Sequence, residues 1–259
     1  MHLIDRYAYS NAIRTLDPAQ KGGLSGLALL LCLFLDRPVV GLLTIIWMFA
    51  LTTLWARIPV LVFGRVLLTE GLFLAFSVLG VAVSISLSPP TSTMAWQVGP
   101  LWLSTSIEAL ELTLRLLTRA LGCAAALNFL ILTTPLTDLI EVLRRLRLPE
   151  TLIELMTLIY RAIFVLLESL ERMRTAQDTR LGFSTPGRAL RSAGLLGSQL
   201  FLDAYRRSRR LEVALESRGL AGPLRVIPLA YTADRRVWWF AAALAATLLL
   251  ARFGSLFPI

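Results

Sequence analysis

The sequence predicts an all-α protein that crosses a membrane several times and carries a cytoplasmic domain of long amphipathic helices. Its 259 residues are 56% hydrophobic, with a mean hydropathy of +0.69, which is more apolar than soluble domains usually are. The formal net charge is +9, and Lys21 is the only lysine. Positive charge in an apolar chain is typical of a membrane protein with basic cytoplasmic loops. The long apolar runs argue against a nucleic-acid-binding protein.

Five apolar stretches predict about five transmembrane helices, since a helix needs about 20 residues to cross a bilayer. Asp36, Arg37 and Pro38 form a tight turn between the first two stretches. The first stretch is short, and without it the C-terminus would lie on the other side of the membrane. With the N-terminus inside, five spans place the C-terminus outside. The approximate positions of the spans are 24–35, 39–56, 66–86, 106–132 and 237–251.

The segment 86–104 is expected to be a loop on the outer face. It contains several prolines and two tryptophans but no lysine or arginine, which is typical of a non-cytoplasmic loop with aromatic residues at the interface. In the span that follows, Glu111, Arg115 and Arg119 are spaced at i, i+4. These three side chains can pair along one helix face.

Arginines then accumulate, with fifteen of them from Arg144 to Arg225. By the positive-inside rule this region is cytoplasmic. We expect it to fold as a short helix at 137–146 and two long helices at 150–181 and 188–218, with Gly219 ending the second. The second long helix has apolar residues at i, i+3, i+4 spacing, so it should lie against a membrane or another helix.

These observations divide the chain into three parts. Residues 1–133 form an N-terminal membrane domain with four spans, residues 134–234 form the cytoplasmic domain, and residues 235–259 form a C-terminal transmembrane helix.

The ends of the two long helices share a pattern. An alanine lies four residues before an arginine, an acidic residue two before it and a hydroxyl residue one before it, and a glycine follows. An arginine and a glycine at a helix end are also ordinary capping residues. Two matched copies suit a partner with two equivalent grooves, such as an ATPase dimer, in which each guanidinium donates to carboxylates. The segments are Ala176-Gln177-Asp178-Thr179-Arg180-Leu181-Gly182 and Ala214-Leu215-Glu216-Ser217-Arg218-Gly219.

Together with further motifs, these ends resemble the transmembrane T component of energy-coupling factor (ECF) transporters, in particular the CbiQ type that serves cobalt transport. The resemblance covers nearly the whole chain. Its N-terminal motif favours the cobalt or nickel branch over the vitamin branch. That N-terminal motif is Ile4-Asp5-Arg6-Tyr7-Ala8-Tyr9. The further motifs are Leu16-Asp17-Pro18 with Lys21, Thr133-Thr134-Pro135-Leu136-Thr137-Asp138, Leu146-Arg147-Leu148-Pro149 and Tyr160-Arg161.

The resemblance implies a mechanism. In that family, coupling helices end in X-Arg-X motifs that dock in grooves of two ATP-binding cassette subunits. ATP binding closes these subunits, moves the helix ends and tilts a membrane-embedded S component that holds the substrate. Leu181 departs from the glycine that is usual after the arginine. The corresponding motifs here are Thr179-Arg180-Leu181 and Ser217-Arg218-Gly219, supported by Ala176, Asp178, Ala214 and Glu216.

The partners implied by the resemblance are two ATPase subunits and a CbiM-like S component, with or without a small accessory membrane subunit. The setting is the bacterial inner membrane. The chain itself is expected to bind no cofactor, with ATP–Mg held by the ATPase subunits. Nor is it expected to be an enzyme, because a P-loop needs Gly-Lys followed by Ser or Thr and Lys21 lies between Gln20 and Gly22. No metal site is expected, since His2 is the only histidine and Cys32 and Cys123 both lie inside apolar runs.

Three alternatives remain open at this point. The chain could be the T component of a nickel or a vitamin ECF transporter. The chain could carry an ion alone, with Glu70 as an intramembrane acid, although Glu70 also suits a helix-end carboxylate near Arg65 or a pair with a neighbouring helix. Finally, basic residues such as Arg206, Arg207, Arg209 and Arg210 could contact anionic lipids.

Overall fold

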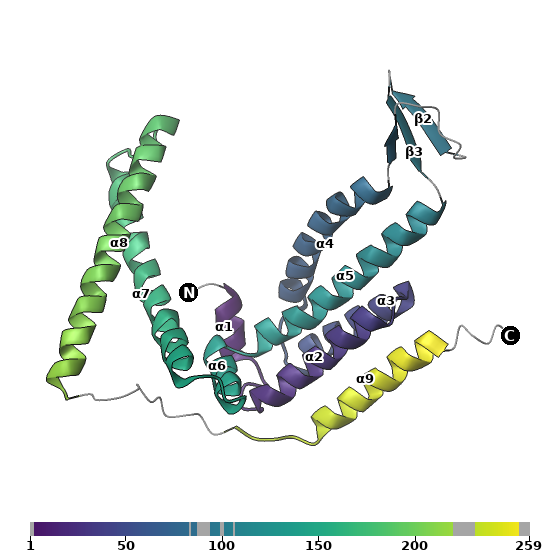
Figure 1. Ribbon diagram of the computed structural model, residues 1–259, viewed down its shortest axis with the longest axis horizontal. Helices are drawn as coiled ribbons and strands as arrows, with labels where there is room; N and C mark the ends of the chain where they lie inside the picture. The colour runs from purple at the N-terminus through teal and green to yellow at the C-terminus, as the bar shows by residue number, and fades with distance from the viewer. Residues whose placement is uncertain are drawn as a thin grey trace. The chain divides into compact units, whose positions relative to one another are not determined.

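The computed structural model describes residues 3–82, 84–86, 94–98, 101–105, 107–219 and 231–253. It divides into two compact units. The arginine-rich unit comprises Leu136–Leu229, and the apolar unit comprises His2–Pro135 with Ala230–Ile259. Helices form most of both units, so the all-α class is confirmed (Figure 1).

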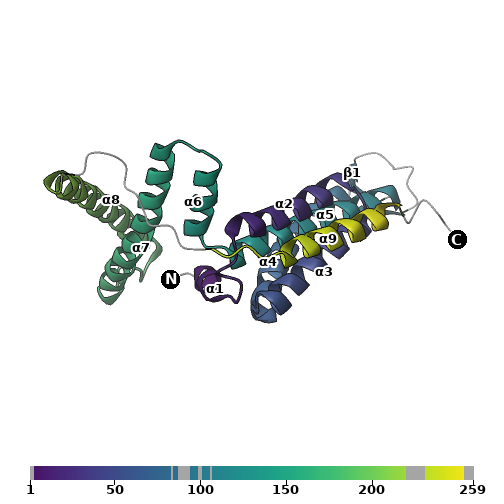
Figure 2. The same cartoon turned by 90° about the horizontal axis from the view of Figure 1, so that it is seen from below.

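Helix α5, Ile107–Thr133, is at the centre of the apolar unit. It packs against α2 (Pro18–Phe34), α3 (Pro38–Ala50) and α4 (Val60–Ala82). Helix α9, Arg236–Phe253, covers α2 and α3, and Figure 2 shows these helices side by side. A short helix α1 (Leu3–Ser10) also contacts α5.

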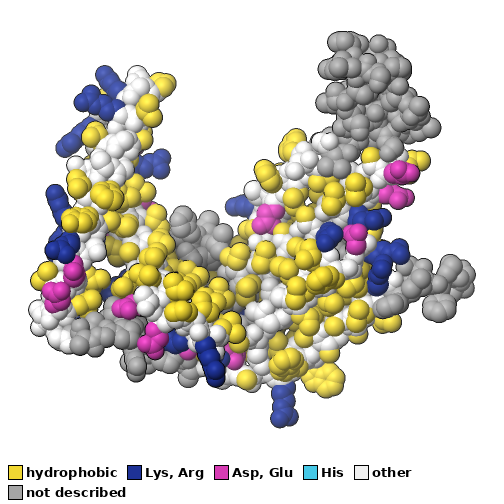
Figure 3. All heavy atoms as spheres, viewed as in Figure 1, with side chains coloured by type: hydrophobic (Ala, Val, Ile, Leu, Met, Phe, Trp, Pro, Cys, Tyr) yellow, Lys and Arg dark blue, Asp and Glu magenta, His cyan; other side chains and the backbone are white. Residues whose placement is uncertain are grey.

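Each of the five expected spans has a helix at its position, which makes the chain a multi-pass membrane protein. Within the described residues, three helical stretches are long and apolar enough to cross a membrane, namely Pro38–Trp55, Val60–Val78 and Ile107–Thr133. Pro18–Phe34 is a shorter apolar helix. Hydrophobic side chains dominate the visible surface of this unit in Figure 3, as lipid contact requires. The full number of spans stays a prediction.

Helix α2 begins earlier than expected, at Pro18 rather than near residue 24. Asp17 is its N-cap, and the Asp17 carboxylate accepts a hydrogen bond from the Ala19 amide at 3.1 Å. Proline suits the first helical position because its missing N–H would have no partner there. The capping residue therefore starts the helix ahead of the apolar run.

The second span ends in a π-helical turn, η1, over Leu51–Trp55. The Ala56 amide donates to the Leu51 carbonyl at 3.0 Å, a five-residue separation that widens the helix locally. The Thr52 hydroxyl donates to the Met48 carbonyl at 2.6 Å. This turn leads through Pro59 into α4.

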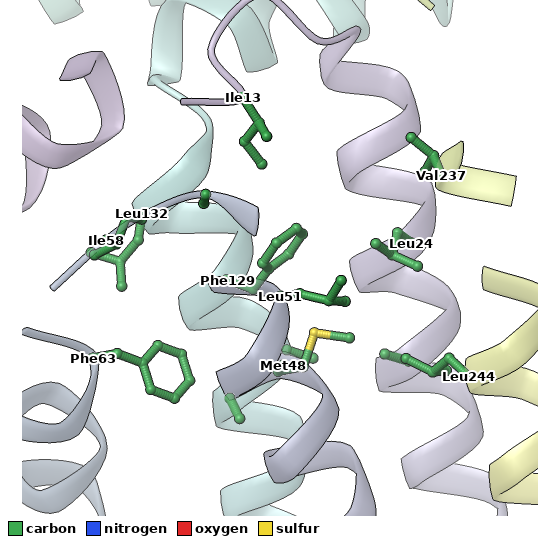
Figure 4. Close-up of a cluster of buried hydrophobic side chains, with 14 of the residues drawn as sticks. Ile13, Leu24, Met48, Leu51, Ile58, Phe63, Phe129, Leu132, Val237 and Leu244 are labelled. Carbon is green, nitrogen blue, oxygen red and sulfur yellow. The ribbon is translucent and has the colours of Figure 1, made fainter. Parts of the chain in front are cut away.

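Helices α3 and α5 cross at two glycines. A side-chain carbon on Gly41 would collide with the Thr118 carbonyl, and one on Gly122 would lie 2.7 Å from the Cys32 sulfur. Small residues at such a crossing let two helix backbones approach closely in a membrane. The apolar unit also contains the core of Figure 4, in which Leu24, Met48, Phe63, Phe129 and Leu244 are buried.

The expectation of a plain loop at 86–104 is wrong. The structure has a three-stranded antiparallel sheet between α4 and α5, with strands β1 (Ser84–Ser86), β2 (Met94–Val98) and β3 (Leu101–Thr105) in the order β1-β3-β2. The strands contain Ile, Val, Trp, Leu and Thr, which favour extended backbone. The prolines that suggested a loop lie outside the described residues.

The arginine-rich unit consists of α6 (Leu136–Arg145), α7 (Glu150–Thr179) and α8 (Pro186–Ser217). Helix α6 packs on α7, and α7 packs on α8. Thr185 caps α8, because its hydroxyl accepts from the Arg188 amide at 3.4 Å and Pro186 follows at the first helical position.

Only part of the apolar stripe on α8 is covered by α7. Leu196 and Leu200 are half-buried, whereas Leu190 is 77% exposed and Phe201 is 70% exposed. The expected second helix is therefore present, but it leaves one apolar face of α8 uncovered within this unit.

Candidate docking site at two helix ends

Helix α7 ends in a Schellman motif that presents Arg180. Arg180 is the C-cap, with φ −95° and ψ 16°, and Leu181 follows in the left-handed region with φ 56°. The Leu181 amide donates to the Asp178 carbonyl and the Gly182 amide to the Gln177 carbonyl, both at 2.9 Å. These two bonds satisfy carbonyls that the helix end would otherwise leave without partners.

Helix α8 ends in the same way at Arg218. This residue has φ −90° and ψ 4°, and Gly219 has φ 67°. The Gly219 amide donates to the Glu216 carbonyl at 2.9 Å, which matches the bond from Leu181 to Asp178. The donor that would complete the motif lies outside the described residues.

The hydroxyl residues before the arginines also play matched parts. The Thr179 hydroxyl donates to the Ala176 carbonyl and the Ser217 hydroxyl to the Ala214 carbonyl, each at 3.0 Å. The sequence pattern is therefore a repeated local structure.

Two features of these ends are not explained by helix stability. Acidic residues in a last turn oppose the helix dipole, yet Asp178 and Glu216 occupy that position. Arg180 and Arg218 are exposed, and across the described part of the chain neither arginine is paired with an acidic side chain. Both ends thus offer a free guanidinium beside a carboxylate-bearing turn.

The two arginines lie at opposite ends of α8. The end of α7 lies beside the start of α8, where the Ser192 hydroxyl donates to the Gly182 carbonyl at 3.0 Å. Helix α8 has 32 residues, and at 1.5 Å per residue it is about 48 Å long. Arg180 and Arg218 are therefore separated by roughly the length of helix α8, which is drawn with α7 in Figure 1.

Glycine has a different role at each end. Gly219 takes the left-handed conformation itself. At the first end Leu181 takes it, while Gly182 is required by close packing, because a side-chain carbon there would lie 2.6 Å from the Ser192 hydroxyl. The departure from the family pattern at Leu181 thus leaves the conformation of the end unchanged.

The crossing of α7 and α8 is held by polar side chains. Arg172 and Arg207 both donate to the buried Ser169 hydroxyl, at 3.3 and 3.2 Å, and Arg207 pairs with Asp203 at 3.0 Å. Hydrogen bonds from Arg207 and then Ser169 hold the pKa of the Asp203 carboxyl below its ordinary value of 3.8. Glu168 pairs with Arg172 at 3.0 Å.

Family motifs that are far apart in the sequence meet at the end of α5. Lys21 is fully buried, with 0% of its side chain exposed, and its ammonium donates to the Thr133 carbonyl at 3.2 Å. The Asn11 amide donates to the same carbonyl at 3.1 Å. A cation there complements the negative end of the α5 dipole. Sequence reasoning missed this cluster. The signal that could have revealed it is that the chain's only lysine lies just before an apolar run.

The structure shows the partners of two sets of charged residues in the apolar unit. Glu70 of α4 accepts a hydrogen bond from Asn128 of α5 at 2.7 Å, so the pair with a neighbouring helix applies. Arg115 and Arg119 do not pair with Glu111 among the described residues. They reach Asp36 in the α2–α3 turn at 3.6 and 3.5 Å, because helix packing brings that turn to their face of α5.

Metal-binding residues do not gather in the described ranges, where no group of three or more His, Cys, Asp or Glu side chains is suited to hold an ion.

Comparison with known proteins identifies the family. The family model described as cobalt transport protein, CbiQ, matches residues 9–228. The chain belongs to the CbiQ family. The match covers both arginine-bearing helix ends.

Curated relatives agree with this CbiQ assignment. The cobalt transport protein CbiQ of Rhodobacter capsulatus is 34% identical over 249 residues, which cover 96% of this chain and 96% of the relative. The cobalt transport protein CbiQ of Salmonella typhimurium is 27% identical and covers 82% of this chain and 94% of its own length. A putative fused cobalt transport protein CbiMQ of Methanocorpusculum labreanum is 33% identical over 147 residues, 56% of this chain and 24% of the relative.

Proposed function

We propose that this CbiQ-family chain is the T component of an ECF-type importer for cobalt ions in a bacterial cytoplasmic membrane. It transmits the motion of two separate ATP-binding cassette subunits to a membrane-embedded S component that binds the metal. The chain holds no ATP itself. ATP–Mg is bound by the ATPase subunits.

The proposal rests on the matched ends of α7 and α8. Each end presents an exposed arginine on a turn of the same type, and the residue after each arginine is in the left-handed conformation. A rigid turn fixes the direction in which a guanidinium projects, and its planar fork suits bidentate binding to a carboxylate. Two such ends a helix length apart fit two copies of one ATPase, and movement of the ATPases would pull on both ends.

Separate ATPase subunits are needed because the chain lacks a P-loop lysine. Lys21 is the only lysine, and its ammonium is buried against the Thr133 carbonyl. An ammonium held there is not available to phosphates.

Association with an S component is supported by two observations. A relative is named as a fusion of CbiM with CbiQ, and fusion keeps two partners together. In this chain the uncovered face of α8, with Leu190 and Phe201, offers apolar surface to a membrane partner.

The test is reversal of charge at the two helix ends. The chain is co-expressed with its ATPase and S subunits as wild type, Arg180→Glu, Arg218→Glu and the double variant. Co-purification of the ATPase and uptake of cobalt and nickel into cells are measured. We expect each single variant to reduce co-purification about tenfold or more, as for a buried charge pair at an interface, and the double variant to abolish uptake of the metal.

The matched control is Arg174→Glu with Arg210→Glu. These arginines are exposed on the same two helices, 6 and 8 residues before Arg180 and Arg218 and outside the capping turns, so the change in net charge is equal. Control proteins should retain the ATPase and uptake. Equal losses in both doubles would mean that general basic charge, as in lipid binding, is responsible, and intact coupling in the Arg180/Arg218 double would refute the proposal.

A stand-alone ion carrier is the second candidate, favoured only by the intramembrane acid Glu70. Because Glu70 bonds to Asn128, we expect Glu70→Gln to keep uptake near the wild-type rate. Loss of uptake in that variant, together with uptake that needs no ATPase subunit, would favour the carrier.

A further inference from the structure

The crossing of α7 and α8 contains a polar groove that the coupling function does not use. Its volume is about 280 Å³. The groove lies away from both helix ends, near the middle of α8. Its lining residues are Ser169, Arg172, Met173, Gln199, Asp203, Arg206 and Arg207.

Positive charge in the groove exceeds negative charge. Three arginines line it against one carboxylate, that of Asp203. Arg207 is paired with Asp203, and Arg172 is paired with Glu168 just outside. Within the part of the chain that the structure describes, Arg206 has no acidic partner. The groove therefore keeps one guanidinium uncompensated.

The arginines are also drawn together by the fold. Arg172 of α7 and Arg207 of α8 both donate to the Ser169 hydroxyl, so their guanidinium groups converge although their charges repel. Ser169 is only 4% exposed, so the two guanidinium groups meet at a buried hydroxyl that lines the groove. Clustered guanidiniums with hydroxyl and amide groups nearby are the chemistry that binds phosphate oxygens.

We propose that this groove binds a phosphate group. Arg206 supplies the uncompensated charge, and the Arg172 guanidinium and the Gln199 amide line the groove as further donors. The phosphate comes either from the headgroup of an anionic phospholipid or from a soluble phosphate compound. A ligand held by residues of both helices ties α7 to α8 at their crossing.

The experiment uses the full chain purified in a neutral detergent. Thermal unfolding is followed while inorganic phosphate is titrated at constant ionic strength and, separately, while phosphatidylglycerol or phosphatidylcholine is added to the micelles. A ligand that binds the folded state raises the unfolding temperature in a saturable way. The groove variant is Arg172→Gln with Arg206→Gln, and the matched control is Arg174→Gln with Arg191→Gln, two exposed arginines of the same helices that do not line the groove.

We expect saturable stabilisation of the wild type and the control, with the apparent affinity at least tenfold weaker in the groove variant. Stabilisation by phosphatidylglycerol alone identifies a headgroup, and stabilisation by inorganic phosphate identifies a soluble ligand. Arg206→Gln alone serves if the double variant does not fold, because Arg206 has no acidic partner to lose. No saturable effect in the wild type, or equal weakening in the control, would overturn the proposal.

Discussion

Leu181 and Gly219 adopt the same left-handed backbone at equivalent positions, yet only glycine does so without steric cost. The left-handed region costs a residue with a side chain roughly 1–2 kcal/mol. Leu181 is 66% exposed, so it recovers little of this cost by burial. The first helix end therefore holds local strain that the second does not.

This difference predicts opposite effects for two substitutions. Leu181→Gly should stabilise the protein, by about 0.5 kcal/mol once the greater freedom of glycine in the unfolded chain is counted. Gly219→Leu should destabilise it by about 1 kcal/mol. Thermal unfolding of the purified chain measures both. Changes of the same sign would contradict the shared conformation.

Asp203 predicts a dependence of stability on pH. The pKa of its carboxyl is lower in the folded protein than in the unfolded chain, since Arg207 and Ser169 donate hydrogen bonds to the carboxylate. Its stabilising contribution is therefore complete above the ordinary pKa and is lost as the pH falls below about 4, through the lowered folded value.

We expect Asp203→Asn to unfold at a lower temperature than the wild type at pH 7 and the two to converge as the pH is lowered from 5 to 3. All other carboxyl groups are the same in both proteins. Glu171→Gln, an exposed site on α7, is the matched control and should show no such convergence. A difference that persists unchanged at pH 3 would contradict the assignment.

At the scale of elements, sequence reasoning located every long helix, because apolar run length, prolines and glycines act through neighbouring residues. It placed the start of α2 too late, since the cap at Asp17 lies in a polar segment. It also missed the strands between α4 and α5. The prolines of that segment indicated a loop, although short runs of strand-forming residues lie around them. The close approach of α3 and α5 was not visible at all, because its glycines look like any others in an apolar helix.

The α3–α5 crossing predicts unequal effects of one substitution at two glycines. Gly41→Ala should destabilise the protein by about 2 kcal/mol, as overpacking does, because the added carbon meets the Thr118 carbonyl. Gly64→Ala in α4 adds the same carbon where no atom lies within 4 Å, and should be neutral or stabilising. The yield and unfolding temperature of the two variants in detergent decide this. Equal behaviour would mean that the helices do not cross at Gly41.

At the scale of the whole molecule, the arginine distribution predicts that the arginine-rich unit is cytoplasmic and the segment 86–104 is on the outer face. Single cysteines test this in a background with Cys32→Ala and Cys123→Ala. Gly187→Cys, at an exposed position with open space around it, should react with a membrane-impermeant maleimide only in inside-out vesicles. Thr91→Cys should react only in right-side-out vesicles, and the reverse result would invert the topology.

The sequence by itself determined the long helices, their approximate limits and the two arginine-bearing ends, because each depends on residues within a few positions of one another. It also determined the family, through short motifs spread along nearly the whole chain. At both ends the hydroxyl residue bonds to the alanine carbonyl three residues earlier, and the residue after the arginine takes the left-handed conformation. Only the tertiary structure decided that Lys21 reaches Thr133, that Asp36 rather than Glu111 receives Arg115, and that Arg172 and Arg207 meet at Ser169. These contacts join separate helices, so they depend on packing geometry, which no local pattern in the sequence carries.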